Sequence, residues 1–289
     1  MTAPYELHAP TTAREALELL DRHGEDAHVM AGGTSLVLLM RQGLVRPGHV
    51  VSLHRVGELR GISRSAEGWL EIGALATHRE IERSPLVRAH CPMLAEAFAK
   101  IATVRIRNQA TLGGNLAHAD PAQDPPPALI VLAAEVLVLG PRGARAIPVE
   151  ELSTDIFATS LEPGELIVGV RVPPLPAGAR ATYRKYLPRT EDDYATVSVA
   201  AAAVVGPDGV LPHVRIALGA VGPTPIRARS AEDALRGQRP DETLIAWAAA
   251  LAAEATDPLD DSRGSAGYKR EMARVFTARA LRELTEARP

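Results

Sequence analysis

Cysteine is nearly absent from this sequence, which has 289 residues and a single thiol, at Cys91. One thiol cannot form an internal disulfide, and it cannot supply the several thiolates that hold an iron–sulfur cluster. The scattered histidines His54, His78 and His90 lack the spacing of a metal site, so no metal ligand is predicted. Such low cysteine content is typical of the reducing cytoplasm, which is the expected location.

An excess of one charge and long apolar runs are also missing. The net charge is −3, so no overall basic field attracts nucleic acid. No apolar run approaches the roughly 20 residues that a membrane-spanning helix needs. The first residues, MTAPYELHAP, lack the basic start and the apolar centre of a signal peptide. With 46% hydrophobic residues, the composition is that of a globular protein without a nucleic-acid partner or a membrane span.

The pattern of apolar and turn-forming residues indicates an α+β protein. Helical spacing over residues 12–24 and apolar runs at 27–31 and 49–53 predict an N-terminal unit with parallel strands. Residues 135–149 predict a β-hairpin. The segment PPLPAGA at 173–179 is the best linker candidate. Three strand-like runs and then three helical segments follow it, and they predict a smaller α+β domain.

Two glycine pairs have the pattern of ligand-binding turns, GGTS at residues 32–35 and TLGGN at residues 111–115. A helix that begins after such a turn presents unpaired N–H groups and the positive end of its dipole, and glycine lets backbone approach a ligand closely. Backbone amides of both turns are therefore expected to bind one diphosphate. The pattern is neither GxGxxG nor a P-loop, and a plain turn remains the alternative for each pair.

Longer segments carry a resemblance to a known family. They are AGGTSLVLLMRQGLVRP, VRIRNQATLGGNLAHADPAQDPPPAL, TSLEPGELIVGVRVP, YRKYLPRTEDDYATVSVAAA, VRIALGAVGPTPIRA and DDSRGSAGYKREMARVFTARAL, in this order. Together they resemble the FAD-binding medium subunit of molybdenum hydroxylases, a family that includes carbon monoxide dehydrogenase medium subunits and the flavin domain of xanthine dehydrogenase. Gln109 departs from the family pattern, because a glycine is frequent at that position.

The resemblance implies an α+β fold in two domains. Residues 1–175 are expected to form an FAD-binding domain of the vanillyl-alcohol oxidase type, with subdomains at about 1–54 and 55–175 and FAD between them. Residues 179–289 resemble the C-terminal domain of the carbon monoxide dehydrogenase flavoprotein, which implies a three-stranded antiparallel sheet and a helical bundle.

The resemblance also implies which residues bind FAD. Asp120 and Asp124 lie where the family places a carboxylate near the ribose or the adenine-side hydroxyls, and Asp124 is favoured. The two pyrophosphate loops of the family match the two glycine turns, at Ala31, Gly32, Gly33, Thr34, Ser35 and Leu36, and at Thr111, Gly113, Gly114 and Asn115.

Further positions match contacts of the flavin ring. Ile101 and Ile167, or Leu166 beside it, match apolar contacts. Lys185 matches a lysine near the pyrimidine edge, where a cation stabilises the anionic reduced flavin. Tyr194 matches an aromatic residue that covers one face of the ring.

Several of these residues also have a plainer interpretation. Lys185 is alternatively a surface charge on a strand, and Tyr194 a core tyrosine. Asp120 and Asp124 are alternatively loop formers beside prolines. His118 is expected to be a loop contact, because electron transfer through a flavin needs no acid–base group, so no catalytic residue is predicted.

The function that the resemblance implies is that of an FAD-containing electron-transfer subunit in a multi-subunit oxidoreductase. Non-covalent FAD would take electrons from the [2Fe–2S] clusters of a small partner subunit and pass them to NAD, a quinone or oxygen. A large partner would hold molybdopterin, and the complex would be a dimer of heterotrimers. Two alternatives remain open: a free-standing FAD-dependent oxidoreductase of the vanillyl-alcohol oxidase type, and a flavin-free assembly scaffold.

Overall fold

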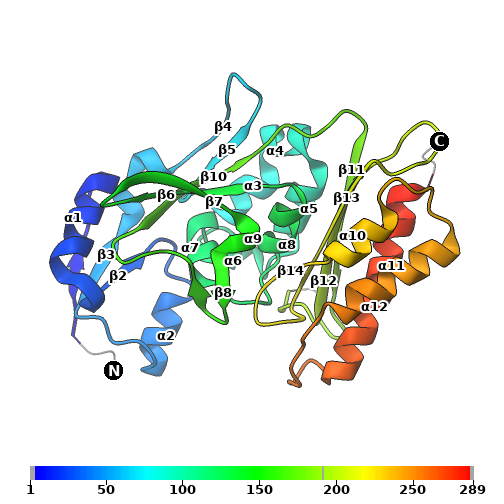
Figure 1. The fold of residues 1–289 in the computed structure, drawn as a ribbon. Coiled ribbons are helices and arrows are strands. Elements are labelled where there is room, and N and C mark those ends of the chain that lie inside the picture. Colours follow the sequence, from blue (N-terminus) through cyan, green and yellow to red (C-terminus); the bar gives the residue numbers. More distant parts are fainter. Residues whose placement is uncertain (1–3, 191, 287–289) are drawn as a thin grey trace.

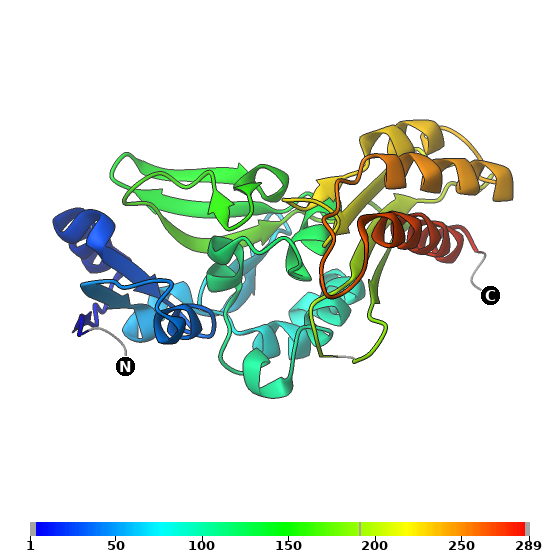
Figure 2. The same ribbon diagram turned by 90° about the horizontal axis from the view of Figure 1, so that it is seen from below.

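The protein is described by a computed structural model over residues 4–190 and 192–286, so the outermost ends of both expected domains lie outside the described residues. Figures 1 and 2 show three parts in a row: an N-terminal unit in blue, a central sheet with helices, and a C-terminal unit in yellow to red. Each part is built around its own β-sheet. A two-stranded ribbon in the central part is formed by β8 (Ser153–Asp155) and β9 (Ala158–Thr159).

The N-terminal unit is a small parallel sheet in the order β1-β3-β2, flanked by helices. Thr12 caps the first helix, because its side chain accepts a hydrogen bond from the Glu15 amide. Gly43 ends the second helix in the left-handed conformation that glycine adopts without strain. The elements are β1 (Glu6–His8), α1 (Ala13–His23), β2 (Ala27–Met30), α2 (Leu36–Gln42) and β3 (His49–Ser52).

The central part contains a five-stranded antiparallel sheet in the order β4-β5-β10-β6-β7. The predicted hairpin is present as β6 and β7, which pair without interruption. A bulge between Ile167 and Gly169 shifts the register of β10 against β6. The strands are β4 (Ile62–Arg64), β5 (Leu70–Gly73), β6 (Glu135–Gly140), β7 (Gly143–Pro148) and β10 (Leu166–Val172). The helices are α3 (His78–Arg83), α4 (Pro85–His90), α5 (Pro92–Ala99), α6 (Val104–Arg107), α7 (Leu112–His118), α8 (Pro125–Val131) and α9 (Val149–Leu152).

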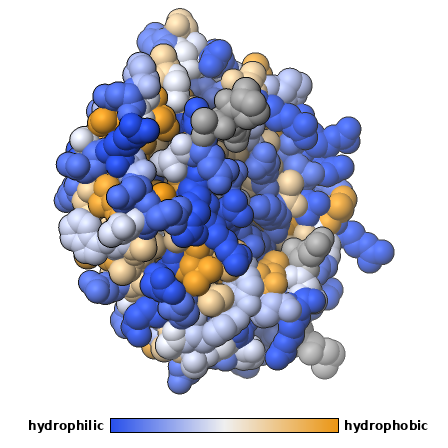
Figure 3. All heavy atoms as spheres, turned by 90° about the vertical axis from the view of Figure 1, so that its right-hand side faces the viewer, coloured by the Kyte–Doolittle hydropathy of each residue, from blue (hydrophilic) through white to orange (hydrophobic). Residues whose placement is uncertain are grey.

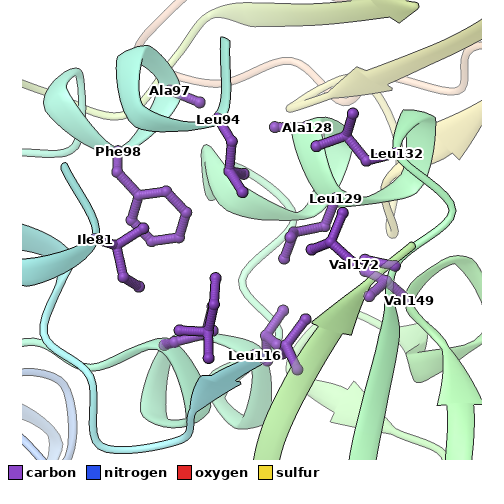
Figure 4. Packing of buried hydrophobic residues seen from close by; sticks show 14 of the residues in the cluster. Ile81, Leu94, Ala97, Phe98, Leu116, Ala128, Leu129, Leu132, Val149 and Val172 are labelled. Atoms are coloured by element: carbon purple, nitrogen blue, oxygen red, sulfur yellow. The ribbon is translucent and has the colours of Figure 1, made fainter. Parts of the chain in front are cut away.

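A single apolar cluster joins these helices to the sheet. In Figure 4, Ile81 of α3, Phe98 of α5 and Leu129 of α8 point toward a common centre, with Leu116 of α7 below them. All four are at most 2% exposed. Burying a side chain of this size contributes about 1.5–3 kcal/mol. Packing of their apolar side chains against the sheet therefore holds the short helices in place. This packing also sets the positions of the loops between the helices.

The C-terminal unit is an antiparallel sheet covered by helices on its outer side (Figure 2). The central strand β12 is rich in alanine and is buried on both faces, because Ala200 packs with the central cluster while Ala201 packs under the helices. Figure 3 shows that the outer end of the molecule is mainly hydrophilic, with scattered apolar atoms. The elements are β11 (Ala179–Tyr186), β12 (Val197–Val204), β13 (His213–Gly219), β14 (Ile226–Arg227), α10 (Arg229–Leu235), α11 (Glu242–Glu254) and α12 (Ala266–Thr285).

The structure confirms the α+β class and differs in one detail of the C-terminal sheet. Three strands were expected, and a fourth, β14, pairs through Ile226 and Arg227 with β13. Two residues give too short an apolar run to be read as a strand from sequence. Among the described residues, no helix has both the length and the apolar character that a membrane crossing requires.

Candidate functional site

The first glycine turn leaves a row of backbone amides without protein partners. It lies between β2 and α2, and within the described chain the amides from Gly32 to Leu36 donate to no protein acceptor. Gly33 has φ +71°, a conformation that favours glycine. Ser35 precedes the helix, but its hydroxyl makes no capping bond. The turn therefore presents N–H and O–H donors, as a phosphate-binding turn does.

The second turn has a different hydrogen-bonding state. Thr111 caps α7, and its Oγ1 accepts a bond of 3.2 Å from the amide of Gly114. The amide of Gly113 donates to the Ala74 carbonyl at 2.8 Å, and that of Asn115 to the Thr111 carbonyl at 2.9 Å. The expectation that both turns offer free amides is thus wrong for these three residues. This turn presents the Thr111 hydroxyl and the buried Asn115 Oδ1, which has no hydrogen-bond partner among residues 4–190 and 192–286.

The two turns lie side by side although about 80 residues separate them. The side-chain amide of Gln109 donates to the Gly32 carbonyl at 2.9 Å. A Cβ placed on Gly32 would lie 2.1 Å from the Gln109 carbonyl oxygen, and one placed on Gly114 would lie 3.6 Å from the Ala31 Cβ. Gly32 is therefore needed for close approach of the two segments. The sequence marked Gln109 only as a departure from the family, and its linking role depends on this tertiary contact.

Asp124 and Lys185 form a buried ion pair. The Lys185 Nζ lies 2.9 Å from Asp124 Oδ2, and the two side chains are 3% and 5% exposed. The Tyr183 hydroxyl donates to the other carboxylate oxygen of Asp124. Lys185 also donates to the Lys100 carbonyl, and Lys100 in turn donates to the Tyr183 carbonyl. These bonds fasten β11 of the C-terminal unit to the loop before α8.

This arrangement decides between the interpretations of Lys185 and Asp124. Lys185 is not a surface charge, since it is buried. The two residues were expected near opposite ends of FAD, and both expectations cannot hold for an extended cofactor, because the side chains touch. Burial raises the pKa of Asp124, and the neighbouring Lys185 opposes this rise. Burial also raises the pKa of Tyr183 well above its usual range, so its hydroxyl stays a donor.

Asp120 and Tyr194 lie beside this pair. Asp120 Oδ1 accepts a bond of 2.9 Å from the Ala122 amide, which is the turn-forming contact of the plainer interpretation. Tyr194 is 42% exposed, so it is not a core residue. Burial of its hydroxyl raises the pKa of Tyr194, and the charges of Asp120 and Asp124 raise it further. The guanidinium of Arg263 stands 5.8 Å from the Tyr194 ring centre.

The apolar positions Ile101 and Ile167 belong to the central core. They are 8% and 4% exposed, whereas Leu166 packs against the N-terminal unit. Arg107 fixes the segment that follows Ile101, because its Nη1 donates to the carbonyls of Ile101 and Ala102 at 2.8 and 2.7 Å. The sequence did not single out Arg107 as a positioning residue.

His118 lies in a loop contact, as expected. Its ring centre is 5.1 Å from that of Phe157, and the Phe157 amide donates to the Ala119 carbonyl. Burial lowers the pKa of His118, so the imidazole is held in its neutral form more strongly than in water.

Comparisons with known proteins agree with this architecture. A family model described as the FAD binding domain in molybdopterin dehydrogenase matches residues 3–175, and one described as the CO dehydrogenase flavoprotein C-terminal domain matches residues 181–284. The carbon monoxide dehydrogenase medium chain of Hydrogenophaga pseudoflava is 37% identical over 96% of both chains. Subunit alpha of the 6-hydroxypseudooxynicotine dehydrogenase complex of Paenarthrobacter nicotinovorans is 38% identical, over 96% of this chain and 94% of that one.

A solved structure of reconstituted CO dehydrogenase from Oligotropha carboxidovorans superimposes with a TM-score of 0.95 at 35% identity and covers 100% of both chains. The quinoline 2-oxidoreductase of Pseudomonas putida 86 gives a TM-score of 0.92 at 34% identity, over 99% of this chain and 98% of that one. With one FAD-domain match over more than half its length and relatives above 30% identity over nearly all of it, this chain belongs to the family of medium, FAD-binding subunits of molybdenum hydroxylases.

Proposed function

We propose that this chain binds FAD non-covalently across the two glycine turns and serves as the electron-transfer subunit of a cytoplasmic molybdenum hydroxylase. In this proposal electrons arrive from [2Fe–2S] clusters of a small subunit and leave to NAD, a quinone or oxygen. A large subunit holds the molybdopterin, and the complex is a dimer of heterotrimers. Residues 1–175 are proposed as the FAD-binding domain and residues 179–289 as the C-terminal domain.

The juxtaposed turns are the observation that carries the proposal. A dinucleotide needs neighbouring donors for its diphosphate, and the turn at Gly32 supplies unpaired amides beside the helix α2. From the other side, Thr111 supplies a hydroxyl donor and the Asn115 side-chain amide supplies N–H donors, whereas its buried Oδ1 can only accept from O–H or N–H groups of the cofactor. The Gln109 carbonyl occupies the space that a Cβ at Gly32 would fill, so the two turns lie close enough for one cofactor to contact both.

The remaining contacts would orient the cofactor and anchor its site. We assign the donor groups at Gly33, Thr34, Ser35 and Leu36 to the diphosphate. Bound FAD supplies the redox chemistry, while the chain binds and orients it. Other residues proposed at the cofactor are Ala31, Ile101, Gly113, Gly114, Asp120, Asp124, Ile167, Lys185 and Tyr194, of which Ile101 and Ile167 act as the apolar wall behind it.

The partners are proposed because the chain lacks the means to hold an iron–sulfur cluster. Its one cysteine, Cys91, is buried, and burial raises the pKa of the thiol, which disfavours the thiolate that a cluster needs. Relatives are named as medium chains or as subunits of a complex, which supports assembly with other chains. One related solved structure is that of a carbon monoxide dehydrogenase that lacks the Mo-pyranopterin moiety of its molybdenum cofactor.

FAD titration of the purified chain tests the cofactor site. Gly32→Ala is expected to weaken FAD binding at least ten-fold, since the added methyl meets the Gln109 carbonyl and separates the turns. Gly57→Ala is the matched control, because nothing lies within 4 Å of its Cβ position and its φ is ordinary. Flavin fluorescence gives the dissociation constants. Failure of the wild-type chain to bind FAD would favour the scaffold alternative.

Co-expression with the neighbouring genes tests the assembly. The chain is expected to co-purify with a large molybdopterin-binding subunit and a small cysteine-rich subunit. Rapid reduction of the complex, followed by mixing with NAD, a quinone or oxygen, identifies the acceptor as the one that reoxidises the flavin fastest. Turnover of a small molecule by the isolated flavin-loaded chain would instead support the free-standing oxidoreductase.

A further inference from the structure

Three histidines from separate elements meet in the N-terminal unit. His8 lies on β1, His23 is the last residue of α1, and His49 begins β3. One ring nitrogen from each lies within 4.8 Å of the others. His8 Nε2 is 3.0 Å from His49 Nδ1, and the rings of His23 and His49 stack with centres 3.7 Å apart. The sequence predicted no metal ligand, because residues 8, 23 and 49 have no recognisable spacing and only the fold unites them.

We propose that His8, His23 and His49 bind a divalent transition-metal ion of the zinc, nickel or copper class, with Glu6 as the fourth ligand. Imidazole nitrogen is a preferred ligand of these ions. In a tetrahedral zinc site with bonds of 2.0–2.1 Å, neighbouring ligand atoms are about 3.3 Å apart. The His8–His49 separation of 3.0 Å is close to such an edge, and a ring nitrogen of His23 lies within 4.8 Å of both.

The carboxylates around the three rings complete the site. One Glu6 oxygen lies 3.7 Å from His8 Nε2, and the other lies 3.6 Å from His49 Nδ1, the same two nitrogens that approach each other. On the opposite edge of its ring, His49 Nε2 faces Asp26 at 4.0 Å, and Asp26 is held by the Gly48 amide. A carboxylate behind the second nitrogen is the usual way to orient a metal-binding histidine.

The chain geometry explains why these groups converge. Glu6 and His8 are two apart on β1, so they share a face of the sheet, and Glu6 is paired in register with His49. His23 reaches the same place from the C-terminal end of α1, where unpaired carbonyls favour a cation.

The proposed metal site is separate from the flavin site. Ala27 pairs with His49 at the start of β2, and the first glycine turn follows Met30 at the other end of that strand. The two sites are thus about 10 Å apart along β2. With four protein ligands and no open position, the ion would act structurally: it would tie β1 to α1 and to β3.

Metal titration of the untagged full-length chain tests the proposal. Calorimetry with zinc is expected to show one saturable site. His8→Ala and His23→Ala should each lower the zinc affinity by more than the 10–100-fold that is typical when a residue that only orients a ligand is removed. Glu6→Gln is expected to weaken it less. His213→Ala, at an exposed position of β13, is the matched control and should leave binding unchanged. Magnesium should not compete, because imidazole is a poor ligand for it.

Cobalt spectroscopy and folding controls make the test decisive. Bound cobalt(II) is expected to show the intense visible absorption of four-coordinate nitrogen and oxygen ligation, and a six-coordinate spectrum would overturn the Glu6 assignment. Circular dichroism and FAD titration of each variant establish that the fold persists, and His23→Gln replaces His23→Ala if the latter unfolds. Absence of saturable zinc binding would show that the histidines only pack together. So would His8 and His23 variants that bind zinc as tightly as the wild type does.

Discussion

The two sides of the candidate flavin site differ in how their polar groups are used. On the side of the first turn, the amides from Gly32 to Leu36 donate to no acceptor in the part of the chain that the structure describes. On the side of the second turn, the amides of Gly113, Gly114 and Asn115 are bonded within the chain, and Asp124 is paired with Lys185. Similar glycine pairs therefore serve two purposes: the first side is open to a ligand, and the second side is a rigid support. Substitutions on the second side should cost mainly stability, except at Thr111, whose hydroxyl is also proposed to bind the cofactor, and those on the first side should cost affinity.

The largest effect is expected at the buried ion pair. Asp124→Ala leaves the Lys185 ammonium buried without its partner, so the free energy of unfolding should fall by about 3–5 kcal/mol. Urea unfolding of the full chain measures this. The double variant Asp124→Leu with Lys185→Met should recover part of the loss, because no charge is then stranded. A loss below about 1 kcal/mol for Asp124→Ala would mean that water reaches the pair.

Gly113→Ala should be the next most harmful change. Its Cβ would lie 2.7 Å from the Ala74 Cβ, in a buried part of α7, so overpacking should cost about 1–3 kcal/mol. Gly267→Ala, which has nothing within 4 Å of its Cβ position, is the control and should be neutral or stabilising. Thermal unfolding of both variants compares them. Equal melting temperatures would show that the second turn is less tightly packed than described.

Comparing two threonine caps distinguishes an effect on stability from an effect on FAD affinity. Thr111→Ala and Thr12→Ala each remove one capping bond, at α7 and α1, and each should cost about 1 kcal/mol. Only Thr111→Ala should also weaken FAD binding, because Thr12 caps α1, which follows neither glycine turn. Parallel unfolding and flavin-fluorescence measurements test this. If both variants bound FAD as the wild type does, the Thr111 hydroxyl would not belong to the site.

The smallest effect on stability is expected at Ser35. Its hydroxyl makes no capping bond, so Ser35→Ala should change the free energy of unfolding by less than about 0.5 kcal/mol while weakening FAD binding. Ser84→Ala should show the opposite pattern, because the Ser84 hydroxyl accepts the Val87 amide and caps α4. A Ser35 variant that lost stability and kept its FAD affinity would contradict the assignment of the first turn to ligand binding.

Local features of this molecule could be predicted from its sequence. The hairpin over 135–149 and the irregular segment after residue 172 depend on residues close in the chain: β6 pairs with β7, and residues 173–178 lie between β10 and β11, whose first residue is Ala179. The α+β class and the order of the helices and strands could be predicted from the spacing of apolar residues. The family could be predicted from the longer motifs. Both glycine turns could be located because glycine and hydroxyl residues next to an apolar helix form a local pattern.

Contacts between distant segments could not be predicted. The Gln109 bond to Gly32 spans 77 residues, and the pair of Asp124 and Lys185 spans 61. Whether an amide near Gly113 is free depends on whether the Ala74 carbonyl is within reach, and neither residue type reveals this. The three histidines of the N-terminal unit were missed for the same reason, since they share no spacing and meet only through parallel strand pairing.

The bonds from Tyr183 and Lys185 to Asp124 have a consequence for any attempt to shorten the protein. A fragment that stops at the linker would retain both glycine turns, yet it would expose the part of the central core that packs against Ala200 and Ala217, and it would leave Asp124 without either partner. The boundary between the two family matches, near residue 175, is thus crossed by buried contacts, and a fragment that ends there is expected to lose stability.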